Sequence, residues 1–298
     1  MIKRTIEISN PAWLKVKHGQ LLVERDNEVI ASVPFEDIGM LIADHPAVTM
    51  TQAVLQHCAQ HNTALVSCDE RHTPALLALP ISGHTLHGKV LRAQVAVKPT
   101  FKKRLWQQVV RGKLTNQGWL LEELKSSATQ RLKQLTSKVK PGDPDNVEAQ
   151  ACKYYWPALF GKQFRRDRDQ TGINQLLNYG YAIARAMTAR AVVASGLHPA
   201  LGLHHHNQYN AYALADDLME PIRPLVDAQV VELARRDIIE INQDSKQALL
   251  GLMAQPVRLG DDKMPLMNAT QRCVQQFCEA LQRGTLKAGW CFPCALEP

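Results

Sequence analysis

The dominant hydrophobic period of this chain changes near residue 76, and that change limits the folds it can adopt. Before it, short runs bounded by turn formers such as His18-Gly19 and Asp26-Asn27 are typical of β-strands, for example TIEIS, WLKVK, QLLVER and EVIASVP. Within this part, residues 48–62 space their apolar side chains three and four apart, which predicts a helix. From residue 89 onward the period is helical. The chain is therefore predicted to be α+β, with a small, mostly β N-terminal domain (residues 1–76), a linker (77–88) and a larger all-α C-terminal domain (89–298).

Breaks within the helical part divide it into separate predicted helices. Two basic helices are expected in residues 89–139, separated near Pro99 or Gly112. A long helix is expected within residues 171–196, where an apolar stripe at helical spacing ends at Gly196. Further helices are expected near residues 145–160, 223–238, 245–254 and 268–284.

Composition favours a folded protein. At 298 residues and 45% hydrophobic content, the chain can bury a substantial core. The first residues lack the apolar run of a signal peptide, and no segment has the ~18 uninterrupted apolar residues of a membrane span. We expect a soluble, cytoplasmic protein. Its seven cysteines follow no disulfide framework, and Cys291 and Cys294 form one CFPC pair, which is half of a typical zinc site.

Positive charge is concentrated in one segment. Between Lys89 and Lys140 there are thirteen Lys or Arg residues and two acids, Glu122 and Glu123, so this segment carries +11 against +7 for the whole chain. A concentrated basic segment on a folded protein is the electrostatic pattern expected for binding a polyanion, most often nucleic acid. The alternative is a basic, solvated helical surface.

Glu148 has two interpretations. It stands three residues after Asp145, at the start of the predicted helix DNVEAQACKYYWPALFG, and this spacing is the pattern of a capping box. Alternatively, a carboxylate at a helix start, followed by the small residues Ala149 and Ala151, faces a functional site. The pattern alone favours the cap. The charged loop that follows contains Arg165 and Arg166, which are either phosphate ligands or solvated side chains.

The segment HPALGLHHHNQYNAYALADDLMEPIRPLVD (residues 198–227) combines histidines with carboxylates. Glu220 follows fifteen residues after the middle one of His204, His205 and His206. Imidazole nitrogen and carboxylate oxygen are ligand types suited to a divalent ion such as Mg2+ or Mn2+. Fifteen residues of straight helix would separate the two by roughly 22 Å, so a shared ion needs a bend, for which Pro221 offers a place. The alternative is a polar loop followed by a solvated helix face.

Four stretches occur in order: Glu148 with YYWPALFGKQF, then NQLLNYGYAIA, SGLHPALGLHHH and DLMEPIRPLVD. Together they resemble the CRISPR-associated integrase of spacer acquisition, the adaptation nuclease of these immune systems, and the DLMEP form resembles its type II branch. The resemblance covers the whole chain. It implies a divalent-metal-dependent DNA endonuclease and integrase that inserts captured fragments (spacers) into a CRISPR array. In that reaction a 3′-hydroxyl attacks a phosphodiester, a step that a Lewis-acidic ion assists.

The same resemblance implies the site residues. Glu148, His205 and Glu220 would be the catalytic residues and the ligands of Mg2+ or Mn2+. Many family members have Asp where this chain has Glu220, so Asp216 and Asp217 are reserve ligands, and His204 and His206 are alternatives to His205. Candidate DNA contacts are Lys102, Lys103, Arg104, Arg165, Arg166 and Arg223.

The resemblance also implies partners. Members form homodimers through the N-terminal domain, and two dimers flank a dimer of a small ferredoxin-like CRISPR adaptation partner, giving a heterohexamer that binds double-stranded DNA. Type II effector proteins are further candidate partners. The basic segment would lie along the duplex and neutralise its phosphates. Two other functions stay open, a non-catalytic basic DNA-binding scaffold and a metal-dependent hydrolase of a small substrate.

Overall fold

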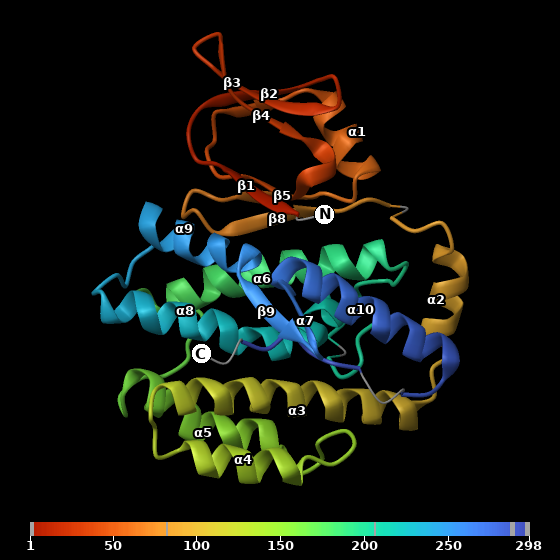
Figure 1. Cartoon of the computed structure of the whole chain (residues 1–298), viewed down its shortest axis with the longest axis vertical. Helices are drawn as coiled ribbons and strands as arrows, with labels where there is room; N and C mark the ends of the chain where they lie inside the picture. Colours follow the sequence, from red (N-terminus) through yellow and green to blue (C-terminus); the bar gives the residue numbers. More distant parts are fainter. Residues whose placement is uncertain (1–2, 82, 206, 287–289, 296–298) are drawn as a thin grey trace.

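The computed structural model describes residues 3–81, 83–205, 207–286 and 290–295, and its two parts are stacked one above the other (Figure 1). The upper part, coloured red to orange, contains the first strands and one helix, and the lower part contains the other helices. The predicted order, a strand-rich N-terminal region followed by a larger helical region, is confirmed.

Two four-stranded sheets form the N-terminal region. The outer sheet has the order β4-β3-β2-β6, in which β2 (Ala12–Lys17), β3 (Gln20–Arg25) and β4 (Glu28–Pro34) are an antiparallel meander and β6 (Val48–Met50) pairs in parallel with β2. The turns of the meander fall at His18-Gly19 and Asp26-Asn27, where the turn formers predicted them. All four residues have positive φ, which suits tight hairpins.

The inner sheet has the order β1-β5-β7-β8 and faces the helical region. Its parallel strands are β1 (Arg4–Ile8), β5 (Ile38–Ala43) and β7 (Ala64–Cys68), and β8 (Pro74–Ala78) pairs antiparallel with β7. Every residue of β5 is buried, because the two faces of the strand enter different cores. Ile38 and Leu41 share a cluster with Val54 of α1 (Gln52–Gln60), whereas Met40 and Ile42 belong to the cluster of the long helix α6 (Ile173–Ala194).

The strands extend slightly beyond the predicted boundary at residue 76. Residues 77 and 78, which were predicted to begin the linker, belong to β8 (Pro74–Ala78) at the edge of the inner sheet. An edge strand tolerates proline, because the missing N–H faces away from the ladder.

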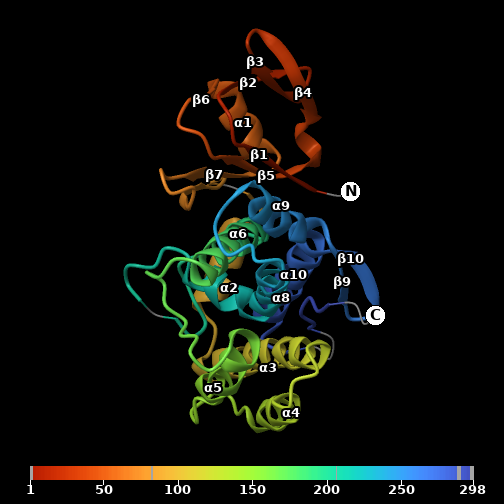
Figure 2. The ribbon, with the colours of Figure 1, turned by 90° about the vertical axis from the view of Figure 1, so that its left-hand side faces the viewer.

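The helical region is organised around α6, the helix predicted within residues 171–196. Its buried side chains, Leu176, Ile183 and Met187 among them, join the core beneath the inner sheet. The other helices, together with three 3-10 turns, are η1 (Phe35–Asp37), α2 (His87–Val95), α3 (Pro99–Glu123), α4 (Thr129–Lys138), α5 (Val147–Phe160), α7 (Ala213–Met219), η2 (Glu220–Ile222), α8 (Arg223–Arg235), α9 (Gln243–Gly251), η3 (Leu252–Ala254) and α10 (Leu266–Arg283). Both ribbon views place α3, α4 and α5 at the end far from the sheets (Figure 2).

The helical region is not purely α-helical. A hairpin of β9 (Pro256–Leu259) and β10 (Asp262–Pro265) interrupts the predicted helical part. Cys294 forms an isolated bridge with Arg258, so the CFPC segment lies along this hairpin. Within the described ranges, no group of three or more His, Cys, Asp or Glu side chains is arranged to hold a metal ion, so the cysteine pair has no further ligands there.

The basic segment contains three helices instead of the predicted two, and its breaks lie just before Pro99 and between Glu123 and Thr129. Pro99 is the first residue of α3, where its missing N–H is tolerated. Gly112, the other predicted break, lies inside α3. A Cβ at Gly112 would lie 2.7 Å from Cδ2 of Phe292, so this glycine makes room for the C-terminal segment instead of ending a helix.

The capping box predicted for Asp145 and Glu148 is absent. Helix α5 begins at Val147, and Oδ1 of its N-cap residue Asn146 accepts a hydrogen bond from the Ala149 amide at 3.4 Å. The Asp143 carboxylate accepts from the amides of Val147 (2.9 Å) and Glu148 (3.1 Å). The Glu148 side chain is therefore not needed as a cap.

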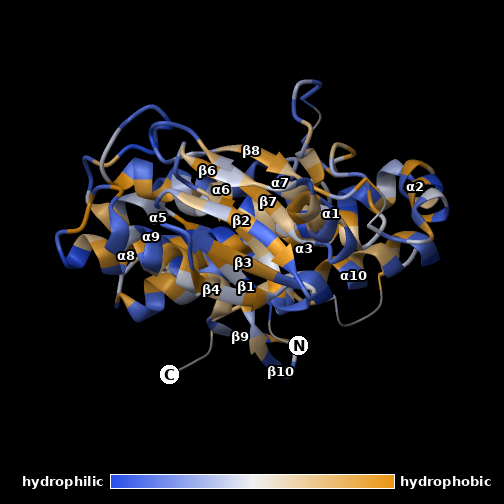
Figure 3. Cartoon of the chain, turned by 90° about the horizontal axis from the view of Figure 1, so that it is seen from above, coloured by the Kyte–Doolittle hydropathy of each residue, from blue (hydrophilic) through white to orange (hydrophobic). Residues whose placement is uncertain are grey.

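Hydropathy follows the layers of the fold. Seen from the β-rich end, β7 and β8 carry hydrophobic colour, and the outer loops are largely hydrophilic (Figure 3). In the described part of the chain, no helix is both long and apolar enough to cross a bilayer.

Candidate active site

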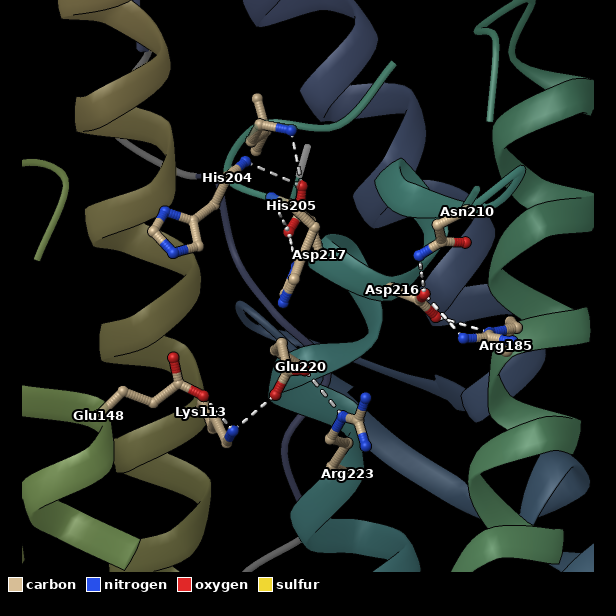
Figure 4. Close-up of polar contacts among 11 residues, drawn as sticks. Lys113, Glu148, Arg185, His204, His205, Asn210, Asp216, Asp217, Glu220 and Arg223 are labelled. Carbon is tan, nitrogen blue, oxygen red and sulfur yellow. Dashed lines mark hydrogen bonds and ion pairs between the residues drawn. The ribbon is translucent and has the colours of Figure 1, made fainter. Parts of the chain in front are cut away.

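Side chains from four segments meet beside α3 (Figure 4). They come from α3, the first turn of α5, the loop 198–212, and the turn where α7 passes into η2 and α8. The bend that the sequence required between His205 and Glu220 is present. The chain leaves the histidine loop, forms the short helix α7, and turns at Glu220-Pro221.

A lysine lies between the two predicted glutamate ligands. Nζ of Lys113 on α3 is 2.5 Å from Oε1 of Glu148 and 2.6 Å from Oε2 of Glu220. Lys113 is 8% exposed and Glu220 is 5% exposed, so this cluster is largely shielded from solvent. The two carboxylates therefore converge on one positively charged group, although they come from α5 and η2.

The pKa values follow from burial and these pairings. Burial lowers the pKa of Lys113, but the carboxylates of Glu220 and Glu148 outweigh burial, so the pKa rises above its ordinary value. Burial raises the pKa of Glu220, but Arg223 and Lys113 together bring it down to about 2. Glu220 is thus an anion and Lys113 a cation at neutral pH.

His205 is held by a buried carboxylate. Its Nδ1 lies 2.5 Å from Oδ1 of Asp217, whose side chain is fully buried. Oδ2 of Asp217 accepts the backbone amides of Leu203 at 2.6 Å and His204 at 3.0 Å, so the same carboxylate fixes the loop. The hydrogen bond that His205 donates to Asp217 raises the pKa of His205, against the opposing effect of burial. When Nδ1 donates to Asp217, the lone pair of neutral His205 is on Nε2.

His204 is engaged elsewhere. Its ring stacks on Trp106 of α3, with centroids 4.4 Å apart and planes 3° from parallel. Figure 4 shows His204 turned toward α3 and His205 beside Asp217. The third candidate, His206, lies outside the described residues. Of the two described histidines, His205 alone has its orientation set by a carboxylate.

The reserve ligand Asp216 also has partners of its own. Its oxygens pair with Arg185, with Nε to Oδ1 at 2.6 Å and Nη2 to Oδ2 at 2.7 Å, and Oδ2 accepts from Asn210 Nδ2 at 2.7 Å. Asp216 and Asp217 thus orient neighbouring groups, whereas Glu220 faces Glu148 across Lys113.

Two carboxylates and one imidazole are the right donor types for a divalent ion. The described part of the chain contains no three His, Cys, Asp or Glu side chains close enough to hold a metal together. The ammonium of Lys113 stands between the carboxylates, so that position stabilises positive charge. The donor set fits a divalent cation chemically, provided that Lys113 moves aside.

Arginines line a cavity of about 180 Å³ next to Glu220. Four of the lining residues are Arg166, Arg168, Arg185 and Arg223, and Asp216 is the acid among them. Nε of Arg223 lies 2.9 Å from Oε1 of Glu220, and its guanidinium is 4.5 Å from the ring centre of Tyr181. Two candidate DNA contacts that are far apart in sequence, Arg166 and Arg223, therefore lie around one cavity.

The other candidate DNA contacts do not reach this cavity. Arg165 donates to the backbone carbonyls of Lys162 and Phe164, which stabilises its own loop. Lys102, Lys103 and Arg104 lie in the first turns of α3, roughly 15 Å along the helix from Lys113. Lys103 and Arg104 are exposed there.

Beneath the arginines, Asp227 of α8 accepts hydrogen bonds from the hydroxyls of Tyr155 (2.7 Å) and Tyr181. Burial raises the pKa of Asp227 to about 6, although the tyrosine hydrogen bonds act in the opposite direction. This buried group joins α5, α6 and α8 under the site.

Several site residues were not identified from the sequence. Lys113 was counted in the basic segment, but its local pattern resembles that of the exposed lysines around it. Trp106 and Arg185 gave no local signal either. Asp217 was noted only as a reserve ligand, and its role with His205 depends on a contact across twelve residues.

Comparisons with known proteins agree with these features. The family model described as CRISPR associated protein Cas1 matches residues 7–257. The CRISPR-associated endonuclease Cas1 of Neisseria meningitidis serogroup C (strain 8013) is 35% identical over 280 residues, 93% of this chain and 91% of that protein. Its similarity is consistent with the type II form suggested by the DLMEP motif.

Two solved structures have the same fold. A casposase bound to integration product matches with a TM-score of 0.75 at 17% identity, covering 97% of this chain and 93% of that one. A chain of a Cas6-RT-Cas1–Cas2 complex matches with a TM-score of 0.75 at 18% identity, covering 99% of this chain and 36% of that one. The resemblance drawn from the sequence motifs is confirmed, and the chain belongs to the Cas1 family of CRISPR-associated proteins.

Proposed function

We propose that this protein is a divalent-metal-dependent DNA endonuclease and integrase that inserts captured DNA fragments into a CRISPR array. The observation that carries the proposal is the convergence of Glu148 and Glu220 on one cationic position, beside an arginine-lined cavity. The names of its relatives support the same activity, since one is a Cas1 endonuclease and a structural neighbour is a casposase bound to integration product.

In this proposal Glu148, Glu220 and Nε2 of His205 would hold Mg2+ or Mn2+. A bound divalent ion would lower the pKa of an attacking hydroxyl and offset negative charge on the phosphate. Asp217 keeps Nδ1 of His205 occupied and so directs Nε2 toward the carboxylates. Lys113 is the cation that balances Glu148 and Glu220 until the ion binds.

Arg166 and Arg223 would bind the phosphodiester under attack. Guanidinium groups suit phosphate oxygens, because their N–H donors form paired, charge-assisted hydrogen bonds. The pentacoordinate transition state carries more negative charge on these oxygens than the ground state, so fixed arginines stabilise it preferentially. The 3′-oxygen of the captured fragment forms a bond to phosphorus as the repeat strand's own P–O bond breaks, and the departing oxygen becomes a free 3′-hydroxyl.

The basic helices would provide sequence-independent affinity for the duplex. Lys102, Lys103 and Arg104, roughly 15 Å along α3 from Lys113, would bind phosphates of the duplex away from the reacting phosphodiester. The assembly proposed with this function is a homodimer formed through N-terminal domain 1–76, and two such dimers bind a small ferredoxin-like partner. The Cas1–Cas2 complexes among the structural neighbours support a partner of this kind.

The decisive experiment is a strand-transfer assay. Purified protein, with and without its small partner, is mixed with a short duplex with free 3′ ends and a supercoiled plasmid carrying a CRISPR repeat. We expect joining with Mn2+ or Mg2+, and its loss on chelation. Glu148→Gln and His205→Ala should abolish joining but retain duplex binding, which depends on Lys and Arg.

Glu122→Gln is the matched control. Glu122 lies on α3 in an exposed ion pair with Lys133, so its change should leave joining intact. Tight, salt-sensitive duplex binding without joining in the presence of the partner would favour the non-catalytic scaffold. If the protein neither binds the duplex nor joins it to the plasmid, the alternative of a metal-dependent hydrolase of a small substrate is favoured.

A further inference from the structure

A second cavity, of about 550 Å³, lies where the N-terminal region meets α6 and α10. Its lining includes Lys3 and His61 from the strand-rich region, and Arg190, Gln271 and Arg272 from the helical region. No Asp or Glu is among the described residues that line it. It shares no residue with the candidate active site.

Arg190 is the central feature of this cavity. The residue is 6% exposed, and its Nε donates to the Asn62 backbone carbonyl at 2.6 Å. Within the described ranges, no carboxylate forms an ion pair with its guanidinium. Burial lowers the pKa of Arg190 to about 10, with no carboxylate acting in the opposite direction. A buried charge without a counter-charge is unfavourable, so proteins usually pair it.

The neighbouring cations increase this imbalance. Burial and the charge of Arg190 both lower the pKa of Lys3, and the nearby Asp37 and Glu36 oppose them weakly. Burial, His57 and Lys3 lower the pKa of His61. Arg272, which also lines the cavity, is already paired with Asp262, so it adds less to the positive charge of the cavity. Arg190, which no carboxylate opposes, therefore leaves a positive charge at the cavity, and Lys3, whose Nζ also donates to the Glu36 backbone oxygen, adds to it.

A hydrogen-bond acceptor in the same lining narrows the ligand class. Oε1 of Gln271 is buried and has no hydrogen-bond partner, and Nε2 of the same amide donates to Ser195 Oγ at 3.3 Å. An unpaired buried acceptor favours a ligand that can donate a hydrogen bond. Phosphate has both properties near neutral pH, because it is anionic and keeps an O–H in its mono-protonated and di-protonated forms. Sulfate is anionic but has no O–H.

We propose that this cavity is a binding site for a phosphate group, either inorganic phosphate or a terminal phosphomonoester in its mono-protonated form, held by Arg190 and Lys3 with Gln271 accepting its O–H. A backbone phosphodiester fits less well, because it has no proton to donate. Since Lys3 and His61 belong to one region and Arg190 and Gln271 to the other, a bound phosphate would fix the strand-rich region on the helices.

The test is isothermal titration of the full-length protein with inorganic phosphate, and separately with sulfate, at constant ionic strength in chloride. Wild-type protein should bind phosphate more tightly than sulfate. Arg190→Gln should weaken phosphate binding at least about tenfold, and Lys3→Gln by a smaller factor. Arg236→Gln, an exposed arginine at the end of α8, is the control and should bind like wild type. Equal affinity for phosphate and sulfate, or wild-type affinity in Arg190→Gln, would overturn the proposal.

Thermal unfolding separates this proposal from a purely structural role of Arg190. A phosphate site predicts that phosphate raises the melting temperature of wild type but not of Arg190→Gln. If Arg190 has only a structural role, Arg190→Gln should lose the same amount of stability with and without phosphate. Arg190→Lys, which keeps the charge, should retain part of the phosphate-dependent shift, and its failure to do so while folded would count against the site.

Short duplexes with a 5′-phosphate or a 5′-hydroxyl identify the source of the group. If the site serves a DNA end, wild type should prefer the phosphorylated duplex, and Arg190→Gln should lose that preference. If wild type binds both duplexes equally but still binds inorganic phosphate, the ligand is the free anion.

Discussion

Lys113 and Glu220 are 107 residues apart in sequence, yet Nζ of Lys113 lies 2.6 Å from Oε2 of Glu220 in a buried contact. The same nitrogen lies 2.5 Å from Glu148, so one lysine balances two carboxylates that repel each other. A divalent ion between these carboxylates would have to displace the ammonium. The lysine therefore supports the metal-free protein and competes with the metal.

The first prediction concerns Lys113→Met. Removing one member of a buried ion pair leaves unpaired charge, so the metal-free variant should lose about 3–5 kcal/mol of unfolding free energy. Mn2+ should restore more stability to the variant than it adds to wild type, because no ammonium competes with it. Melting temperatures in EDTA and over a Mn2+ series measure both effects. Lys133→Met, which removes an exposed ion pair with Glu122, serves as the control. An identical Mn2+ shift in wild type and Lys113→Met would contradict the competition.

The second prediction concerns the close approach at Gly202. A Cβ there would lie 2.5 Å from the backbone oxygen of His205 and 2.9 Å from Oδ2 of Asp217. Gly202→Ala should push the histidine loop off Asp217, lower the unfolding free energy by about 1–3 kcal/mol, and weaken Mn2+ binding. Gly251→Ala has no heavy atom within 4 Å of the added carbon, so it should be neutral or slightly stabilising. Denaturant unfolding and Mn2+ titration of both variants test this, and a fully stable Gly202→Ala with wild-type Mn2+ affinity would contradict it.

The third prediction distinguishes the adjacent histidines. His204→Ala removes a ring stacked on Trp106, so it should lower stability by about 0.5–1.5 kcal/mol and leave strand transfer detectable. His205→Ala should abolish strand transfer with a smaller effect on stability, because its ring is partly exposed. Urea unfolding and strand transfer should be measured on the same preparations. If His204→Ala abolishes strand transfer and His205→Ala does not, the metal ligand is His204 and the prediction is wrong.

The fourth prediction concerns pH and Asp227. Its pKa in the folded protein is about 6, above the ordinary 3.8, so the folded state binds the proton more tightly than the unfolded chain. The stabilisation from this group is complete below its ordinary pKa and is lost as pH rises through 6. Between pH 5 and pH 8, wild type should therefore lose about 1–2 kcal/mol relative to Asp227→Asn, which lacks the titration. Urea unfolding across this range provides the test, and a pH-independent difference between the two proteins would contradict it.

Local patterns gave most of the order of elements, because periodicity and turn chemistry are properties of neighbouring residues, but they missed the β9-β10 hairpin and one of the three helices of the basic segment. The turns at His18-Gly19 and Asp26-Asn27 and the long helix ending before Gly196 follow from them. The helix predicted for residues 48–62 forms only over Gln52–Gln60, because Val48–Met50 is strand β6. Ends and edges were harder to predict. Asn146 caps α5 instead of Asp145, and Pro74 begins an edge strand, because each outcome depends on the neighbouring chain.

By itself, the sequence determined a strand-rich region followed by helices, a concentrated basic segment, and the motifs that named Glu148, His205 and Glu220. The tertiary structure decided which basic residue is buried between Glu148 and Glu220, which described histidine Asp217 orients, and that Arg166 and Arg223 share one cavity. The physical reason is distance along the chain. Propensity acts over a few residues, whereas burial and charge pairing depend on contacts between segments as far apart as Lys113 and Glu220, and these exist only after the helices have packed.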